Sequence, residues 1–147
     1  MGQAAALAMA QKNWQKFEAK FASLPEKLPA PQFLTSDLLA NWPIDQSIDL
    51  LIANLPYIPK ERLAMLDSSV RDFEPLLALD GGADGLRLVD RLLNQAKSRL
   101  VPDGVIWLEV DETHTPEQLQ ALRPEYHYEF FSDSFGKARF MRATLIS

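Results

Sequence analysis

The sequence predicts an α/β fold with a mostly parallel sheet that ends in an antiparallel hairpin. Two largely apolar runs, at residues 48–53 (interrupted only by Asp49) and 105–108, have the composition of strands that are buried on both faces, which is typical of parallel sheets. A segment with helical spacing of its apolar residues lies between them, so strand, helix and strand alternate. At 147 residues the chain can bury a core of its own, and we expect a single domain over residues 1–147.

The amino-terminal elements are predicted to be a long helix, a short strand and a helical turn. Apolar residues recur every three or four positions in the first segment, which is typical of an amphipathic helix, and Pro25 and Pro29 are expected to end it. Gln32–Thr35 has the pattern of a strand, and residues 38–42 that of a helical turn. The helical stripe consists of Leu7, Ala10, Trp14, Phe17, Phe21 and Leu24.

A long connection at residues 59–84, with a short helix near residues 61–66, follows the strand at 48–53. Connections of this length are often functional. Asp84 is placed to cap the next helix, and residues 102–104, Pro-Asp-Gly, turn the chain into the strand at 105–108. The stripe of that helix consists of Leu86, Val89, Leu93, Ala96 and Leu100.

The last third of the chain is predicted to contain a capped helix and a hairpin. Thr115, followed by Pro116 and Gln118, has the pattern of a helix start with a capping box. The strands at residues 126–132 and 138–146 are joined near Phe135-Gly136 and close the chain as an antiparallel hairpin.

Composition and charge exclude several classes of function. The formal charge of −5, without a cluster of Lys and Arg, argues against tight non-specific binding to nucleic acid. The absence of cysteine excludes disulfides and thiolate metal sites, and His114 and His127 share no ligand spacing, so no metal site is expected. The sequence has neither a transmembrane-length apolar run nor a secretory-type leader, so the expected compartment is the cytoplasm.

Asn54-Leu55-Pro56-Tyr57 directly follows the first apolar strand and is the strongest candidate for a functional site. Open α/β sheets bind ligands along the edge where parallel strands end. The Asn54 side-chain oxygen and the Leu55 carbonyl can each accept one N–H of a planar amide or aromatic amine, and Tyr57 can stack on it. Pro56 has no N–H to compete. The motif therefore favours methyl transfer to a planar nitrogen by positioning; the alternative is a strand-ending turn.

Further blocks of sequence accompany this motif. Residues 74–86 read Glu-Pro-Leu-Leu-Ala-Leu-Asp-Gly-Gly-Ala-Asp-Gly-Leu, residues 100–104 form a Leu-x-Pro-x-Gly turn, and Asp133, Gly136 and Arg139 form an Asp-x-x-Gly-x-x-Arg pattern. In this combination and order, the chain from about Ala4 onward resembles the HemK/PrmC-type protein-(glutamine-N5) methyltransferases, the release factor glutamine methyltransferases, whose own motif is Asn-Pro-Pro-Tyr.

The resemblance implies a partial Rossmann-like methyltransferase fold, with this chain as the carboxyl-terminal part of the domain. It implies S-adenosylmethionine as cofactor and a glutamine side chain of a peptide-chain release factor as substrate. Asn54 and Tyr57 would be catalytic, and the four residues of the motif would bind the substrate together with Glu74. Asp37 and Asn54 would contact the cofactor, with Asp37 near the adenine, although Asp37 can equally cap a helix.

Two departures from the family pattern keep another hypothesis open. Leu55 replaces the first proline, and Asn-Leu-Pro-Tyr is also the form seen in ribosomal RNA adenine dimethyltransferases. An N6-adenine methyltransferase acting on nucleic acid is therefore an alternative. In addition, the family's Glu-Ile-Gly-x-x-Gln stands here as Glu-Val-Asp-Glu-Thr-His at residues 109–114, so the glycine and the glutamine are both replaced.

The third departure is that the family's Gly-rich cofactor loop and first two strands have no counterpart. Residues 81–85, Gly-Gly-Ala-Asp-Gly, lack the G-x-G-x-x-G spacing and are expected only to turn the backbone. Two missing central strands would leave a gap of about 14 Å in the sheet. Residues 32–35 could pair with 50–53, another copy could fill the gap, or a first half could lie on another polypeptide; we favour an oligomer or altered pairing. A non-catalytic binding or structural module is the third hypothesis.

Overall fold

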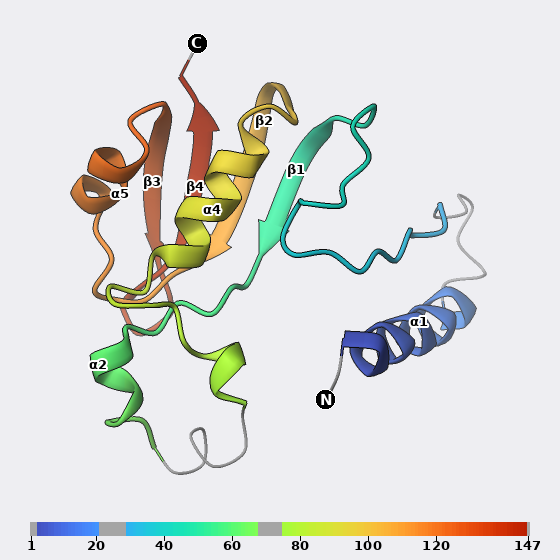
Figure 1. The fold of residues 1–147 in the computed structure, drawn as a ribbon, viewed down its shortest axis with the longest axis horizontal. Helices are drawn as coiled ribbons and strands as arrows, with labels where there is room; N and C mark the ends of the chain where they lie inside the picture. Colours follow the sequence, from blue (N-terminus) through green and yellow to red (C-terminus); the bar gives the residue numbers. More distant parts are fainter. Residues whose placement is uncertain (1–2, 21–28, 68–74, 147) are drawn as a thin grey trace. The chain divides into compact units, whose positions relative to one another are not determined.

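A computed structural model describes residues 3–20, 29–67 and 75–146, which fall into two compact units, Met1–Pro43 and Ile44–Ser147. The first unit contains helix α1 (Gln3–Lys20), which confirms the predicted amino-terminal helix (Figure 1). The rings of Trp14 and Phe17 on its apolar stripe lie 5.6 Å apart. The end of the predicted stripe and Pro25 lie outside the described residues.

The predicted strand at Gln32–Thr35 is not formed, and this segment has no regular secondary structure. A strand depends on hydrogen bonds to a neighbour, and this segment has none of the ladder pairing that would define one. The helical turn that follows is confirmed as a turn: the Ala40 N–H donates to the Asp37 carbonyl at 3.1 Å, and the Trp42 N–H to the Leu39 carbonyl at 3.1 Å.

The second unit is built on a four-stranded mixed sheet in the order β1-β2-β4-β3. β1 pairs with β2 in parallel, whereas β4 is antiparallel to both β2 and β3. The predicted α/β class and closing hairpin are therefore confirmed. The prediction of a mostly parallel sheet is wrong for the described strands, because the segment expected as a further parallel strand forms none. The strands are β1 (Ile48–Ala53), β2 (Leu100–Glu109), β3 (Tyr126–Ser132) and β4 (Ala138–Leu145).

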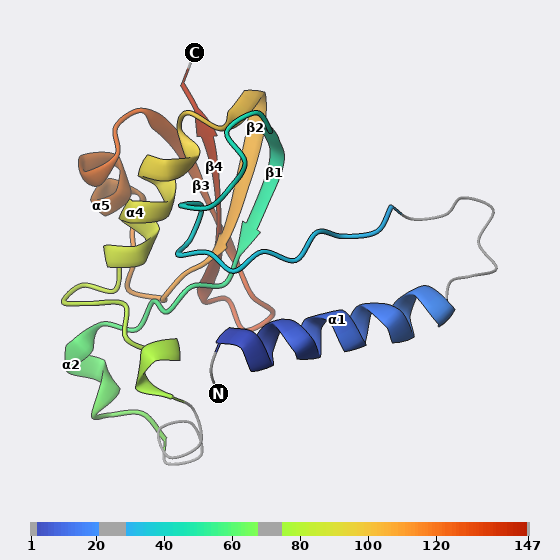
Figure 2. The same ribbon diagram turned by 45° about the vertical axis from the view of Figure 1, so that its right-hand side comes forward.

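Helices α4 (Arg87–Ala96) and α5 (Pro116–Leu122) cover one face of this sheet, as both views show (Figures 1 and 2). The apolar side of α4 is buried at Val89, Leu92, Leu93 and Ala96, and packing against the sheet removes it from water, the main favourable term in folding. Leu100, which was predicted to continue this stripe, is instead the first residue of β2. Two short helices, α2 (Lys60–Leu63) and η1 (Leu76–Ala78), lie in the long connection after β1. The core includes Val89, Leu92, Leu93, Ala96, Ile106, Leu108, Leu119, Tyr126 and Met141.

The two helix starts predicted from sequence have different outcomes. The capping box of α5 is confirmed: the Gln118 N–H donates to Thr115 Oγ1 at 3.3 Å, and the Thr115 N–H donates to Gln118 Oε1 at 2.9 Å. Asp84 does not cap α4, since Leu86 is the N-cap residue. The Asp84 carboxylate instead accepts the Leu86 N–H at 2.9 Å, in a turn that includes Gly85 at a φ of 82°.

β1 forms one edge of the sheet among the described strands, and two of its apolar side chains are exposed. Leu50 is 55% exposed and Ile52 is 72% exposed. Residues 32–35, which were predicted as one possible partner strand for residues 50–53, form no strand. In the described part of the chain, no helix is long and apolar enough to cross a membrane.

Candidate functional site

The motif at residues 54–57 begins immediately after β1, at the edge where both parallel strands end. Ala53 is the register partner of Leu108, so Asn54 and Glu109 are the next residues on neighbouring strands. The prediction that the motif lies at the carboxyl edge of a parallel pair is confirmed (Figure 1). Asn54 is exposed, and residues 55–57 are half-buried.

A hydrogen bond joins Tyr57 to the end of β2. The Tyr57 hydroxyl donates to Glu109 Oε1 at 2.5 Å, which is the length expected for a phenol bound to a carboxylate. Burial raises the pKa of Tyr57 to about 12, the hydrogen bond and the charge of Glu109 add to this, and Arg139 opposes it. Tyr57 is therefore protonated at neutral pH and acts as a hydrogen-bond donor, not as a base.

A cavity of about 150 Å³ lies beside Asn54 and is partly open to solvent. Its walls are mainly apolar, and its polar side chains are those of Asn54 and Glu109, at the strand ends. A planar polar group at this rim would meet an amide on one side and an apolar surface on the other. The lining residues are Ile52, Ala53, Asn54, Trp107, Leu108, Glu109 and Phe140.

The glycine block at residues 81–85 packs directly on the backbone of the motif. A Cβ at Gly81 would lie 2.8 Å from the Tyr57 carbonyl carbon, and a Cβ at Gly85 would overlap the Tyr57 carbonyl oxygen. The Ile58 N–H donates to the Leu79 carbonyl at 3.0 Å, and the Gly81 N–H donates to the Ile58 carbonyl at 3.0 Å. The block therefore turns the backbone, as predicted, and it also fixes the chain after Tyr57.

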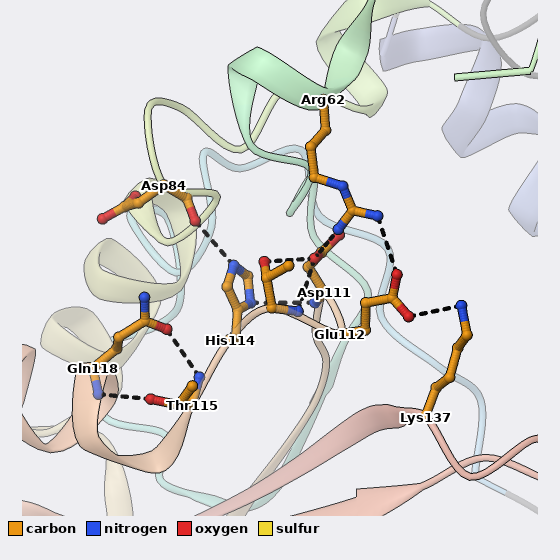
Figure 3. Close-up of polar contacts among 9 residues, drawn as sticks. Arg62, Asp84, Asp111, Glu112, His114, Thr115, Gln118 and Lys137 are labelled. Carbon is orange, nitrogen blue, oxygen red and sulfur yellow. Dashed lines mark hydrogen bonds and ion pairs between the residues drawn. The ribbon is translucent and has the colours of Figure 1, made fainter. Parts of the chain in front are cut away.

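His114 connects this glycine block to the end of β2, a contact that sequence reasoning missed. Its Nε2–H donates to the Asp84 carbonyl at 3.1 Å, and its Nδ1 accepts the Asp111 N–H at 3.2 Å (Figure 3). This pair of bonds fixes the neutral tautomer with the proton on Nε2. Burial lowers the pKa of His114, against the opposing effect of the Asp84 carbonyl.

Ion pairs hold α2 to the same loop. Arg62 binds the carboxylate of Asp111, which is 5% exposed, and lies 3.2 Å from Glu112 (Figure 3). Glu112 also pairs with Lys137 at 2.8 Å. The residues that replace the family's glycine and glutamine, Asp111 and His114, thus have hydrogen-bonded roles in this structure. In the sequence, the only indication of these roles was that the two residues differ from the family pattern.

Two other predicted site residues, Glu74 and Asp37, are not placed relative to the motif. Glu74 lies outside the described residues. Asp37 belongs to the first compact unit and is exposed, so its contact with a cofactor stays a prediction. It caps no helix, because the turn there is not an α-helix; instead Ser36 Oγ accepts the Asn41 N–H at 2.9 Å.

Comparison with known proteins gives a consistent set of relatives, although no protein-family model matches the chain. A release factor glutamine methyltransferase from Gloeobacter violaceus is 39% identical over 94 residues, covering 62% of this chain and 33% of that protein. Proteins of the same name from Deinococcus radiodurans and Bordetella pertussis are 35% and 34% identical over 113 and 120 residues. These alignments cover 76% and 82% of this chain, and 40% and 39% of those proteins.

This chain is a relative of the release factor glutamine methyltransferases. Its alignments cover between 33% and 40% of the length of these relatives. The resemblance read from the motif at residues 54–57 and the block at residues 74–86 is confirmed.

The richest glycine segment, residues 81–85, is already packed on the Tyr57 backbone, where added atoms would overlap. The strand ends present an exposed amide, a hydrogen-bonded phenol and a mainly apolar cavity.

Proposed function

We propose that this chain provides the acceptor-binding part of an S-adenosylmethionine-dependent glutamine N5-methyltransferase. The substrate would be a glutamine side chain in a peptide-chain release factor. The observation that carries the proposal is the position of Asn54-Leu55-Pro56-Tyr57 at the common end of β1 and β2, with Tyr57 bound to Glu109. The names of the relatives support the choice of substrate.

The residues of the motif would orient the substrate amide. Asn54 Oδ1 and the Leu55 carbonyl would accept its two N–H groups, and the ring of Tyr57 would lie along its plane. An amide nitrogen is a poor nucleophile because its lone pair is delocalised, so two fixed acceptors stabilise the positive charge that develops on the nitrogen. The cofactor would supply the methyl group, and groups beyond the described residues would be needed to hold it.

A Rossmann-like sheet without its first two strands is part of the same proposal, as is the single domain over residues 1–147. The exposed edge of β1 supports the proposal that the sheet is incomplete. A strand at the edge of a sheet, with exposed apolar side chains, is a surface on which another strand can pair. A second copy would be one way to complete the sheet. Light scattering coupled to size-exclusion chromatography would give twice the chain mass in that case, and the mass of one chain would reject it.

A non-catalytic binding module is a second candidate, favoured by the use of the glycine block for packing. Two measurements on an assembly that contains the chain separate the candidates: calorimetric titration with S-adenosylmethionine, and mass spectrometry of a release factor incubated with this assembly and the cofactor. Methylated glutamine supports the proposed function. Methylation of ribosomal RNA in a parallel reaction, with an unmodified release factor, would support the N6-adenine alternative. Neither product, together with no cofactor binding at millimolar concentration, would support the binding module.

A further inference from the structure

The contact between Tyr57 and Glu109 joins residues that lie far apart in the sequence and next to each other at the strand ends. Glu109 occupies the position on β2 that follows Leu108, the register partner of Ala53 on β1. Its carboxylate therefore stands level with the first residue of the motif and accepts the hydroxyl of the last, at 2.5 Å. Glu109 is also one of the residues that line the cavity beside Asn54.

Strand β4, which pairs with β2 on the side opposite β1, contributes charge around this contact. Arg139 of β4 interacts with both Tyr57 and Glu109, and it lies 3.8 Å from the carboxylate of Asp133. The Val110 N–H donates to the Arg139 carbonyl at 2.9 Å, which ties the end of β2 to β4. The Tyr57 hydroxyl thus binds Glu109, the charge of Glu109 acts on Arg139, and Arg139 in turn lies beside Asp133.

Resting on the function proposed above, we infer that Glu109 is a positioning residue, whose carboxylate fixes the Tyr57 ring beside Asn54 in the orientation that receives the substrate amide. A tyrosine ring that is half-buried retains freedom about its side-chain bonds unless its hydroxyl is bound. A hydrogen bond to a carboxylate is about twice as strong as one between neutral groups. Fixed groups of this kind reduce the ordering that must occur when the substrate binds.

The first test needs neither cofactor nor substrate. The chain is labelled with tyrosine carrying ¹³C at Cζ, and the signal of Tyr57, assigned by its loss in Tyr57→Phe, is followed during a pH titration. Burial and Glu109 both raise the pKa of Tyr57, so Glu109→Gln, which removes the charge but keeps an acceptor, is expected to lower the midpoint by on the order of one pH unit. Glu129→Gln is the control, because Glu129 pairs with Arg142 at 2.6 Å on β3 and β4 and not with Tyr57. An unchanged Tyr57 midpoint in Glu109→Gln overturns the inference.

The second test measures turnover in an active assembly that contains the chain. Glu109→Gln and Tyr57→Phe are each expected to lower kcat by roughly 10-fold, which corresponds to about 1.4 kcal/mol at 25 °C. The double variant is expected to lose no more than either single variant, because both changes remove the same contact. Losses that multiply, or a full kcat in Glu109→Gln, would overturn the positioning role.

The two tests also separate this inference from the proposed function. A lower Tyr57 midpoint with no methylation of any release factor refutes the proposed function and leaves the structural part of the inference standing. Methylation that needs Asn54 but is indifferent to Glu109 refutes the inference and leaves the proposed function standing. Circular dichroism of each variant shows whether its fold is retained.

Discussion

Substitution of Gly85 by alanine tests how closely the glycine block packs on the motif. Gly85 has a φ of 82°, which an L-residue adopts at a cost of about 1 to 2 kcal/mol. The added Cβ would also lie 2.7 Å from His114 Nε2 and would overlap the Tyr57 carbonyl oxygen. Forcing an atom into packed surroundings costs about 1 to 3 kcal/mol more, so we expect a total loss of about 2 to 5 kcal/mol.

Gly136 provides a matched control. Its φ is 78°, and a Cβ built on it would have nothing within 4 Å. Gly136→Ala should therefore lose only the backbone part, about 1 to 2 kcal/mol. Urea unfolding followed by circular dichroism gives both free energies. Equal losses in the two variants would show that Gly85 tolerates a side chain and that the glycine block does not press on Tyr57, which would refute this account of the block.

Two further predictions concern local features of the second unit. Because the folded-state pKa of His114 lies below that of the unfolded chain, its contribution to stability is present above about pH 6.5 and is lost as pH falls through the folded-state value. The unfolding free energy should decline over that range, and His114→Gln should flatten the decline. A decline that persists in His114→Gln would assign it to other groups. Thr115→Ala should cost about 1 kcal/mol in urea unfolding, because it removes the capping box of α5, and Gln120→Ala on the exposed side of that helix should cost less; the reverse order would deny the cap its role.

Features set by neighbouring residues could be predicted from the sequence. The capping box of Thr115 and Gln118 involves residues three apart, and the helix start was correctly predicted. The position of residues 54–57 also followed from the sequence, because an apolar strand that ends at a proline leaves the motif at the sheet edge. The hairpin from residue 126 to residue 145 combines a local turn with strong strand patterns.

Features that depend on distant partners could not be predicted. Gln32–Thr35 has the composition of a strand, but strand formation is decided by a neighbour that a single sequence does not show. Asp84 was assigned as a cap because of its residue type, yet the conformation of Gly85 places it outside the helix start. The bonds of Glu109 to Tyr57 and of His114 to the Asp84 carbonyl join residues 52 and 30 positions apart. The residue types of Glu109 and His114 indicated that each would form hydrogen bonds, but not with which residue.

The most direct test of the proposed site is the effect of Asn54→Ala on methylation of release factor glutamine, measured by mass spectrometry in an active assembly that contains this chain. Loss of one of two acceptors aimed at the reacting nitrogen should lower the rate by about 100-fold or more, with an unchanged circular dichroism spectrum. Asn13→Ala on the exposed surface of α1 is the control and should retain full activity. An Asn54→Ala variant as active as this control would contradict the assignment of the motif to substrate binding.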